Sequence, residues 1–450
     1  MNLQQEVFQT YKQEIEAHRE ENRAGAIALK DNMFRSPLYF KDRYTSKTLQ
    51  IPKVYSEETA EAFKSICSMT HRIFEKVIRE YLSHADYRAL FPFDKELEEL
   101  ILTPIGYEAL LPMARFDIFY HEDTGDFYFC EINTDGTSAM NEDYYQGKLI
   151  LDNPAHQRVI RKYRLRQFEL FDSWVNTFLQ LYSTYERRVE HPNIAIMDFL
   201  DQGTYREFQE FCYRFQKAGC FCEICDIRSL SYRDGVLYSD KGNRIDAIYR
   251  RAVTSDIMKH TKETAPLLQA VREQKVFMAG SFTSQIIHNK WLFHILRLSR
   301  TKSFLSDEEN AFVEAHIPKT GRIGEDFPME EVLSDKDAYI LKPLDSYGSN
   351  GIHAGVECTK EEWEEAVREA AKEDSLCQEY CPQYKTENID FAWGDGEWHS
   401  YLNMAGLYVY NGAFAGVFSR QAEGNGIIAS HRNERTLPTF VVSEAFHYGS

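Results

Sequence analysis

The stretch from Met113 to Ser138 constrains the fold of this chain more than any other, because it predicts an antiparallel hairpin with a charged face. Two runs, 115–120 and 127–133, are rich in aromatic and β-branched residues. The segment between them, 122–126, reads Glu-Asp-Thr-Gly-Asp and is typical of a turn. We therefore expect the two runs to pair as neighbouring strands.

The register of this hairpin decides which side chains meet. If the turn centres on Thr124, Asp117 lies opposite Glu131, and Arg115 lies opposite Asn133. Because side chains alternate along a strand, these four share one face. The other face then carries Phe116, Ile118, Cys130 and Ile132.

Two carboxylates that face each other repel, so a positive partner is expected beside them. Mg²⁺ prefers oxygen ligands, and Asp117, Glu131 and the Asn133 carbonyl would supply them with room left for phosphate oxygens. Arg115 would then be a second positive group beside a phosphate. The alternative is an ordinary hairpin whose polar face carries a cross-strand salt bridge, and the hairpin alone favours that alternative.

Composition excludes several classes of function. The chain has 450 residues, enough for two or three packed units, and its 52 basic and 70 acidic side chains give a net charge of −18. This balance argues against nucleic acid and acidic membranes as partners. No apolar run of about 18 residues occurs, and the N-terminal segment is polar. We therefore expect a cytoplasmic protein, and its nine cysteines suit a reducing compartment.

A cluster of cysteines raises the question of zinc. Cys212, Cys220, Cys222 and Cys225 lie close together, but no second pair at zinc-finger spacing and no histidine accompany them. The segment 220–225 alternates like a strand. We therefore expect buried thiols rather than a metal site.

The chain divides into regions of different pattern. Residues 1–105 are expected to be a helical region, with one amphipathic helix over 1–30 and another that begins at Ser56. Residues 143–187 continue a helical pattern apart from a break near Pro154.

A strand–helix–strand rhythm over 191–285 predicts a parallel α/β unit. Arg250 and Arg251 end its last strand, where such sheets commonly bind ligands, but ordinary surface charges are the more frequent explanation.

A later segment has the composition of a phosphate-binding loop. The strand 339–343 carries Lys342 and leads into the loop 344–352, which contains Gly348 and Gly351. Backbone N–H groups of such a loop can close over phosphates while the lysine reaches their oxygens. The lysine precedes the glycines, so this is not a Walker loop. A polar segment, 305–328, is expected to be a linker, and 401–420 a hairpin that ends at Arg420.

In their order, these motifs resemble the ATP-grasp ligases, specifically the circularly permuted branch that contains glutathionylspermidine synthetase. The resemblance covers about 105–425 and rests on Arg115-x-Asp117, Glu131-x-Asn133-x-Asp135, Asn289-Lys290, Lys342-Pro343 with Gly348 and Gly351, Gln378-x-Tyr380-x-Pro382, and Arg420. The permutation follows because the Glu-x-Asn motif precedes the phosphate-loop lysine.

The resemblance implies a role for each matched position. Asp117, Glu131 and Asn133 would bind two Mg²⁺ ions, and Arg115 and Arg420 would stabilise the phosphoryl group in transfer. The positions expected to contact ATP are Lys290, Lys342, Ser346, Gly348, Gly351, Gln378, Glu379 and Tyr380. Within that set, the stretch 379–382 would hold adenine by its backbone.

The implied fold is a circularly permuted ATP-grasp fold of mixed α/β class, with a helical N-terminal region and a pre-ATP-grasp-like parallel unit. Its core would comprise 106–190 with the metal-binding hairpin and 286–450 with the ATP-binding part. The implied reaction joins a small-molecule carboxylate, such as a peptide or amino acid, to an amine through an acyl phosphate. The alternative is a nucleotide-binding protein that keeps this fold without ligase activity.

The sequence departs from the family where Gly136-Thr137-Ser138 replaces the expected Thr-Pro on the acceptor side. We expect no amidase domain before the ligase part, because the first hundred residues are too few and too helical. Glutathione and spermidine are therefore not assigned as substrates. Oligomeric state is left open.

Overall fold

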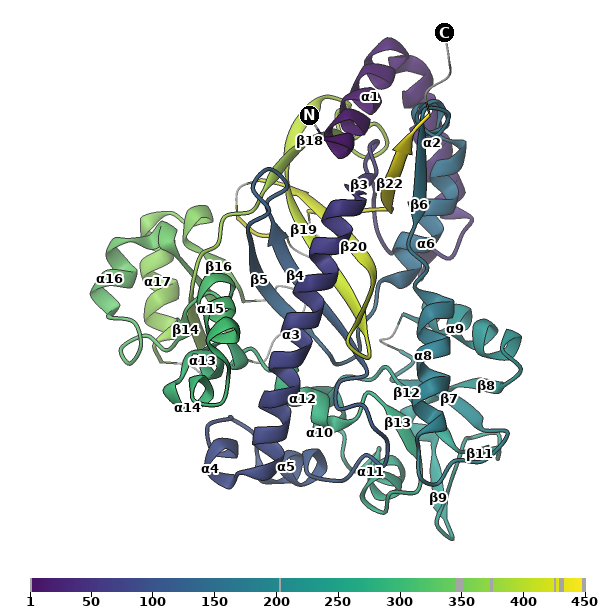
Figure 1. Ribbon diagram of the computed structural model, residues 1–450, viewed down its shortest axis with the longest axis vertical. Coiled ribbons are helices and arrows are strands. Elements are labelled where there is room, and N and C mark those ends of the chain that lie inside the picture. The colour runs from purple at the N-terminus through teal and green to yellow at the C-terminus, as the bar shows by residue number, and fades with distance from the viewer. Residues whose placement is uncertain are drawn as a thin grey trace.

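The computed structural model describes residues 2–201, 204–344, 351–372, 375–424, 426–428 and 433–446. At its centre is a six-stranded antiparallel sheet in the order β21-β20-β19-β4-β5, with β18 paired to β19 (Figure 1). Its strands are β4 (Met113–Tyr120), β5 (Phe127–Asn133), β18 (Lys385–Ile389), β19 (Trp398–Tyr410), β20 (Ala413–Glu423) and β21 (Glu434–Leu437). The expected hairpins over 113–133 and 401–420 are thus confirmed and share one sheet.

The long helix α3 (Glu57–Ser83) runs along the central sheet (Figure 1). Ser56 caps its N-terminus, as the sequence predicts, and the side-chain oxygen of Ser56 accepts from the Thr59 N–H. Phe74 of this helix packs edge-on against Phe116 of β4, with ring centroids 5.6 Å apart. Helix α3 therefore covers the apolar face of the β4–β5 hairpin.

Residues 3–34 form two helices rather than the single helix expected over 1–30. Helices α1 (Leu3–Ala17) and α2 (Arg19–Phe34) meet at His18, whose backbone leaves the helical region. The buried Asn22 side chain donates to the His18 carbonyl oxygen at 3.0 Å. This hydrogen bond stabilises the break.

The helical expectation for 143–187 was also wrong in part. Between the helices α6 (Met140–Leu149), α7 (Pro154–Val159) and α8 (Phe171–Ser183) lies a strand, β6 (Tyr163–Gln167). It pairs with β22 (Thr439–Ala445), which also pairs with β3 (Lys53–Ser56). The partner of β6 lies almost 280 residues downstream, so a local pattern could not reveal it.

The parallel unit is confirmed. Its sheet has the order β13-β12-β7-β8, and all three pairings are parallel. The strands are β7 (Asn193–Asp198), β8 (Phe221–Asp226), β12 (Ala247–Arg250) and β13 (Phe277–Ala279), and α9 (Tyr205–Lys217) connects β7 to β8. Cys222 and Cys225 of β8 are buried, as the strand pattern predicts, and all nine cysteines lie outside disulfides.

The expectation that Arg250 and Arg251 are surface charges was wrong. Their exposed fractions are 2% and 3%, and each pairs with a buried carboxylate at 2.6 Å, Asp135 and Glu207 respectively. Gly136 allows this packing because its backbone has φ +64° and a Cβ there would lie 2.6 Å from the Arg251 carbonyl oxygen.

A small sheet with the order β14-β17-β15-β16 forms a separate lobe (Figure 1). Its strands are β14 (Thr320–Gly321), β15 (Tyr339–Pro343), β16 (His353–Ala354) and β17 (Ser375–Glu379), accompanied by α16 (Met329–Ser334) and α17 (Lys360–Ala370). The expected linker over 305–328 is instead structured, because Ser306 and Glu309 form a capping box that starts α15 (Asp307–His316).

The remaining elements complete the layers around these sheets. They are β1 (Tyr39–Phe40), β2 (Arg43–Tyr44), α4 (Ala85–Arg88), α5 (Lys95–Ile101), β9 (Ser231–Arg233), β10 (Val236–Tyr238), β11 (Arg244–Ile245), α10 (Thr254–Lys259), α11 (Ala265–Arg272), α12 (Gln285–His288), α13 (Leu292–Arg297), α14 (Ser299–Lys302) and the 3-10 turns at Ile150–Asp152, Ile227–Ser229, Phe282–Ser284, Lys336–Ala338 and Gly355–Glu357. Within the described ranges, no helix has the length and apolar character needed to cross a membrane.

Candidate active site

The β4–β5 hairpin has the register that the sequence predicts around its acidic residues. Asp117 pairs with Glu131, and Arg115 pairs with Asn133. Beyond that point the register shifts, because Ile118 pairs with Phe129 and leaves Cys130 as an extra residue. The hairpin therefore contains a β-bulge directly beside Glu131.

This bulge corrects the expectation that Cys130 shares a face with Phe116. Cys130 instead packs beside Phe119 and Met404, and it lines the cavity described below. An extra residue in one strand reverses the alternation of the side chains that follow it. The sequence offered no signal for the bulge.

Asp117 is the centre of a buried cluster of charges. Its side chain is fully buried and accepts two hydrogen bonds from the Arg115 guanidinium, at 2.7 and 3.0 Å. Arg420 of β20 donates to the same carboxylate at 2.6 Å. The cluster thus joins residues 300 positions apart, as the ordered motifs predict.

The amide of Asn133 links the two acidic residues. Its Nδ2 donates to Asp117 Oδ2 at 3.0 Å and to Glu131 Oε1 at 3.4 Å. The three residues that the sequence predicts as metal ligands therefore lie in mutual contact.

The two carboxyl groups have opposite pKa shifts. Burial raises the pKa of Asp117 above its ordinary value, even with two arginines in contact. Burial also opposes ionisation of Glu131, but Arg420 and a hydrogen bond with Asp117 outweigh it and lower its pKa to about 2. Glu131 is therefore the more acidic group of the pair.

Gly406 makes room for this cluster. It lies opposite Asp117 in the middle of β19, and a Cβ at this position would be 2.7 Å from Asp117 Oδ1 and 2.8 Å from Arg115 Cδ. A side chain at position 406 would displace the ion pair.

A cavity between the central sheet and the small lobe collects most of the remaining predicted residues. Its walls include Glu131, Asn133, Lys290, Lys342, Gln378, Glu379, Tyr380 and Arg420. They come from β5, the link between α12 and α13, β15, β17 and β20. Arg115 and Asp117 lie behind this wall and reach it through Arg420 and Asn133.

Lys342 is fixed by a chain of hydrogen bonds. Its Nζ donates to Gln378 Oε1 at 2.6 Å, and Gln378 Nε2 donates to Thr320 Oγ1 at 2.8 Å. Gln378 lies opposite Ile340 on the paired strand, so the β15–β17 ladder positions both groups. Sequence reasoning missed Thr320, which lies in the segment interpreted as a linker.

Lys290 lines the same cavity and helps to lower the pKa of Glu131. Lys290 lies in the link between α12 and α13. This link turns the lysine toward the acidic pair.

The predicted adenine-binding stretch, 379–382, forms another wall of the cavity. Two of its backbone N–H groups are already used, because Glu379 N donates to the Lys319 carbonyl at 2.9 Å and Tyr380 N to the Ala338 carbonyl at 2.8 Å. Pro382 has no N–H group. Cys381, which also lines the cavity, is therefore the residue whose backbone N–H suits this role best.

The predicted phosphate loop is described only in part. Ser346 and Gly348 lie outside the described residues. Gly351 has φ +71°, and a Cβ there would lie 2.8 Å from Pro343 Cγ. A glycine is thus required where the loop returns to the lobe.

The donor set suits a hard divalent cation that shares its coordination with a ligand. It offers the carboxyl groups of Glu131 and Asp117 and the amide oxygen of Asn133, all of which are acceptable to Mg²⁺. Among the described residues, no group of three or more His, Cys, Asp or Glu could hold a metal ion. Phosphate oxygens would have to supply the remaining ligands.

Comparisons with known proteins were made at the level of sequence and of structure. No protein-family model matches the chain, and no curated protein matches it. A glutathione synthetase-like effector (GSS30) from Globodera pallida, in the apo form, matches in structure with a TM-score of 0.59 and 10% identity, over 93% of this chain and 96% of that one. The chain has a glutathione synthetase-like fold.

A second solved structure is a putative γ-glutamylcysteine synthetase from Methylobacillus flagellatus KT. It matches with a TM-score of 0.43 and 11% identity, over 86% of this chain and 89% of that one. The mixed α/β architecture and the first of these neighbours agree with the expected ATP-grasp-like ligase fold. The circular permutation and the predicted unit boundaries stay predictions.

Proposed function

We propose that the protein is an ATP- and Mg²⁺-dependent carboxylate–amine ligase of the glutathionylspermidine synthetase-like type. The single observation that supports this most is the cavity shared by Glu131, Lys290, Lys342 and Arg420, which come from four distant segments. Phosphoryl transfer requires converging positive charge and an acidic metal-binding group more than covalent chemistry from the protein.

The proposed reaction has two steps. The substrate carboxylate attacks the γ-phosphorus of ATP, forming an acyl phosphate and releasing ADP. The amine then attacks the acyl carbon, so that phosphate leaves and the nitrogen loses a proton. The product is an amide, and the overall balance is acid plus amine plus ATP to amide, ADP and phosphate.

Each residue has a physical role in this proposal. Lys290 and Lys342 bind the phosphates of ATP, and the stretch 379–382 holds adenine. Bound Mg²⁺, held by Asp117, Glu131 and Asn133, would neutralise the charge that builds up on the transferring group.

Arg420 is the group best placed to stabilise the transferring phosphoryl group. Its side chain is 6% exposed, and among the described residues its Nε has no hydrogen-bond partner. A buried donor without a partner is costly, so an anionic ligand on the cavity side would complete its bonding. Arg115 holds Asp117 in place from behind.

The cavity encloses about 190 Å³, whereas drug-sized ligands occupy pockets of roughly 300–1,000 Å³. We therefore expect the small lobe and the central sheet to separate when ATP enters. This fits a site that must admit two further substrates.

The test is ADP release in the presence of Mg²⁺ with pooled carboxylates and pooled amines, followed by mass measurement of any condensed product. The proposal predicts ADP release that requires both pools and a product whose mass equals acid plus amine minus water. Tight ATP binding with no ADP release across a broad panel would instead favour the nucleotide-binding alternative.

A further inference from the structure

A second cavity lies on the other side of the central sheet from the proposed nucleotide site. Arg420 and Gln421 are neighbours on β20, so their side chains point to opposite faces, and each lines a different cavity. The second cavity has a volume of about 620 Å³, within the range of roughly 300–1,000 Å³ typical of small-molecule sites. It is enclosed by α1, β3, β18 and the β4–β5 turn.

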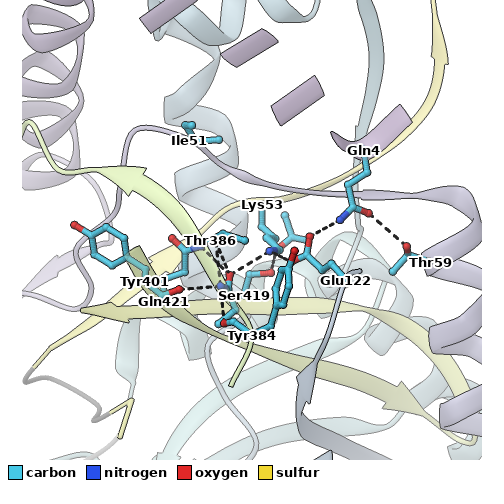
Figure 2. A network of polar contacts seen from close by, with 12 residues as sticks. Gln4, Ile51, Lys53, Thr59, Glu122, Tyr384, Thr386, Tyr401, Ser419 and Gln421 are labelled. Carbon is cyan, nitrogen blue, oxygen red and sulfur yellow. Dashed lines mark hydrogen bonds and ion pairs between the residues drawn. The ribbon is translucent and has the colours of Figure 1, made fainter. Parts of the chain in front are cut away.

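A buried ion pair lies in the wall of this cavity. Lys53 of β3, 6% exposed, donates to Glu122 of the β4–β5 turn and to Asn403 Oδ1 at 3.1 Å. Gln4 of α1 also donates to Glu122 (Figure 2). A buried ion pair contributes little net stability compared with apolar packing, so its presence beside an open cavity suggests a role in recognition.

Amide and hydroxyl side chains continue from this ion pair. Gln421 Nε2 donates to Asn403 Oδ1 at 2.8 Å and to Thr386 Oγ1 at 2.7 Å (Figure 2). Asn388 Nδ2 donates to Gln421 Oε1 at 3.1 Å. These groups provide donors and acceptors of the kind that a peptide bond or a small polar molecule requires.

One chain segment connects the two cavities. Tyr380 and Gln383 line the proposed nucleotide site, and the next residues, Tyr384 and Thr386, line the second cavity. At the hairpin tip, the Nε2 atom of His121 lies 3.0 Å from the carbonyl oxygen of Pro382. The residue after His121 is Glu122, so the tip contacts the segment that separates the cavities.

We propose that the second cavity is a regulatory site for a small zwitterion, a free amino acid or a dipeptide. The ligand's carboxylate would pair with Lys53, its ammonium group with Glu122, and its remaining polar atoms with the amide side chains. A simple anion would be repelled by Glu122 and a simple cation by Lys53. Binding in the second cavity changes the affinity for the nucleotide, because the segment 380–386 borders both cavities. This coupling rests on the proposed function, whereas the binding itself does not.

The binding is tested by thermal unfolding of the full chain without nucleotide, in the presence of each of the twenty amino acids or of glycylglycine. At saturation at least one of them raises the Tm by roughly 2 °C or more. The double variant Lys53→Met/Glu122→Gln abolishes that rise. The variant Gln9→Trp also abolishes it, because Gln9 is an exposed residue of the cavity wall and the indole would fill the space without altering the ion pair.

The matched control is Lys64→Met/Glu61→Gln, which removes an exposed ion pair and leaves the rise unchanged. The proposed site is overturned if no compound raises the Tm, or if the rise persists in both cavity variants.

The coupling is tested with a fluorescent ATP analogue, whose Kd changes about fivefold or more when the amino acid is bound. An unchanged Kd overturns the coupling alone. Failure of the analogue to bind overturns the proposed function but not the amino-acid site.

Discussion

Asp117 and Asp135 are both buried aspartates paired with arginine, yet their surroundings differ. Asp117 contacts Arg115 and Arg420 beside an open cavity. Asp135 and Arg250 are each 1% exposed at the side chain and pair at 2.6 Å, and neither residue lines that cavity.

Arg250 and Arg420, the arginines paired with Asp135 and Asp117 respectively, differ in their hydrogen bonding. Arg250 also donates to the carbonyl oxygens of Gly280 and Ala252. The hydrogen-bond donors of its guanidinium group are therefore used within the protein. Arg420 keeps a buried Nε that has no hydrogen-bond partner among the residues that the structure describes. The Asp135 pair therefore stabilises the fold, whereas the Asp117 cluster retains donors for a ligand.

The pKa shifts follow the same division. Burial opposes ionisation of Asp135, but Arg250, His288 and the hydrogen bonds with Thr254 together outweigh it and lower the pKa. The pKa of Asp117 is raised by burial in spite of its two arginines. A carboxyl group with a raised pKa beside an ionised one is an arrangement that a divalent cation would relieve.

The largest expected effect comes from removing the charge of the ligand-facing cluster. Glu131→Gln should lower ADP formation about a thousandfold, because it removes an acidic metal ligand while preserving shape. Because the folded protein stabilises the ionised form of Glu131, this variant should also lose part of its free energy of unfolding, and urea unfolding checks that it stays folded under the assay conditions. Glu308→Gln is the control at an exposed glutamate. Full turnover in both Glu131→Gln and Asp117→Ala would contradict the ligase proposal.

A change in the buried Asp135–Arg250 pair should affect the stability of the fold rather than the activity. Arg250→Met leaves Asp135 buried without its partner and should reduce the free energy of unfolding by about 3–5 kcal/mol. Urea titration measures this loss. Arg272→Met, which removes an exposed ion pair, should cost less than about 1 kcal/mol. An unfolding free energy of Arg250→Met equal to that of the native protein would show that the pair is not structural.

A third buried aspartate, Asp143, extends the comparison to a carboxyl group whose described hydrogen-bond partners are all neutral. Burial raises its pKa to about 7, although its oxygens accept from Thr439 N and Gln167 Nε2. Because the folded protein then holds a proton that the unfolded chain loses near pH 4, stability should fall as pH rises from 4 to 7.

The variant Asp143→Asn imitates the protonated form. It should remove this slope and exceed the native protein in stability at pH 8, as measured by urea unfolding at several pH values. Parallel pH profiles for the two proteins would exclude Asp143 as the source of the slope.

The smallest effect is expected in the hydrogen-bond chain behind Lys342. Thr320→Val removes the acceptor of Gln378 Nε2 and should raise the KM for ATP about fivefold, since one neutral hydrogen bond contributes about 1 kcal/mol. Steady-state kinetics at saturating acid and amine measure this change, and kcat should stay the same. A fall in kcat at constant KM would mean that Gln378 acts in the transition state.

Local patterns predicted the parts of the fold whose partners are close in sequence. The β4–β5 register, the start of α3 at Ser56 and the parallel unit all follow from turn chemistry and short-range alternation. Strand β6 was missed because its partner comes from the C-terminal end of the chain. The break at His18 was missed because a buried side chain of the following helix stabilises it.

The candidate site shows the same limit. The order of the motifs along the chain predicted that Glu131, Lys342 and Arg420 belong to one site, and the structure places all three in the wall of one cavity. The pairing of Arg250 with Asp135 was not predicted, because a charged pair at a strand end has the same composition whether it is buried or exposed. Thr320 and the bulge at Cys130 have no composition signal at all.

Gly406 offers a way to sort proteins that share this architecture. Because a methyl group there would collide with both the Asp117 carboxylate and the Arg115 side chain, any chain with a larger residue at the equivalent point must have lost or rebuilt the ion pair. The residue at this one position therefore distinguishes proteins of this fold that retain the ion pair from those that retain only the fold.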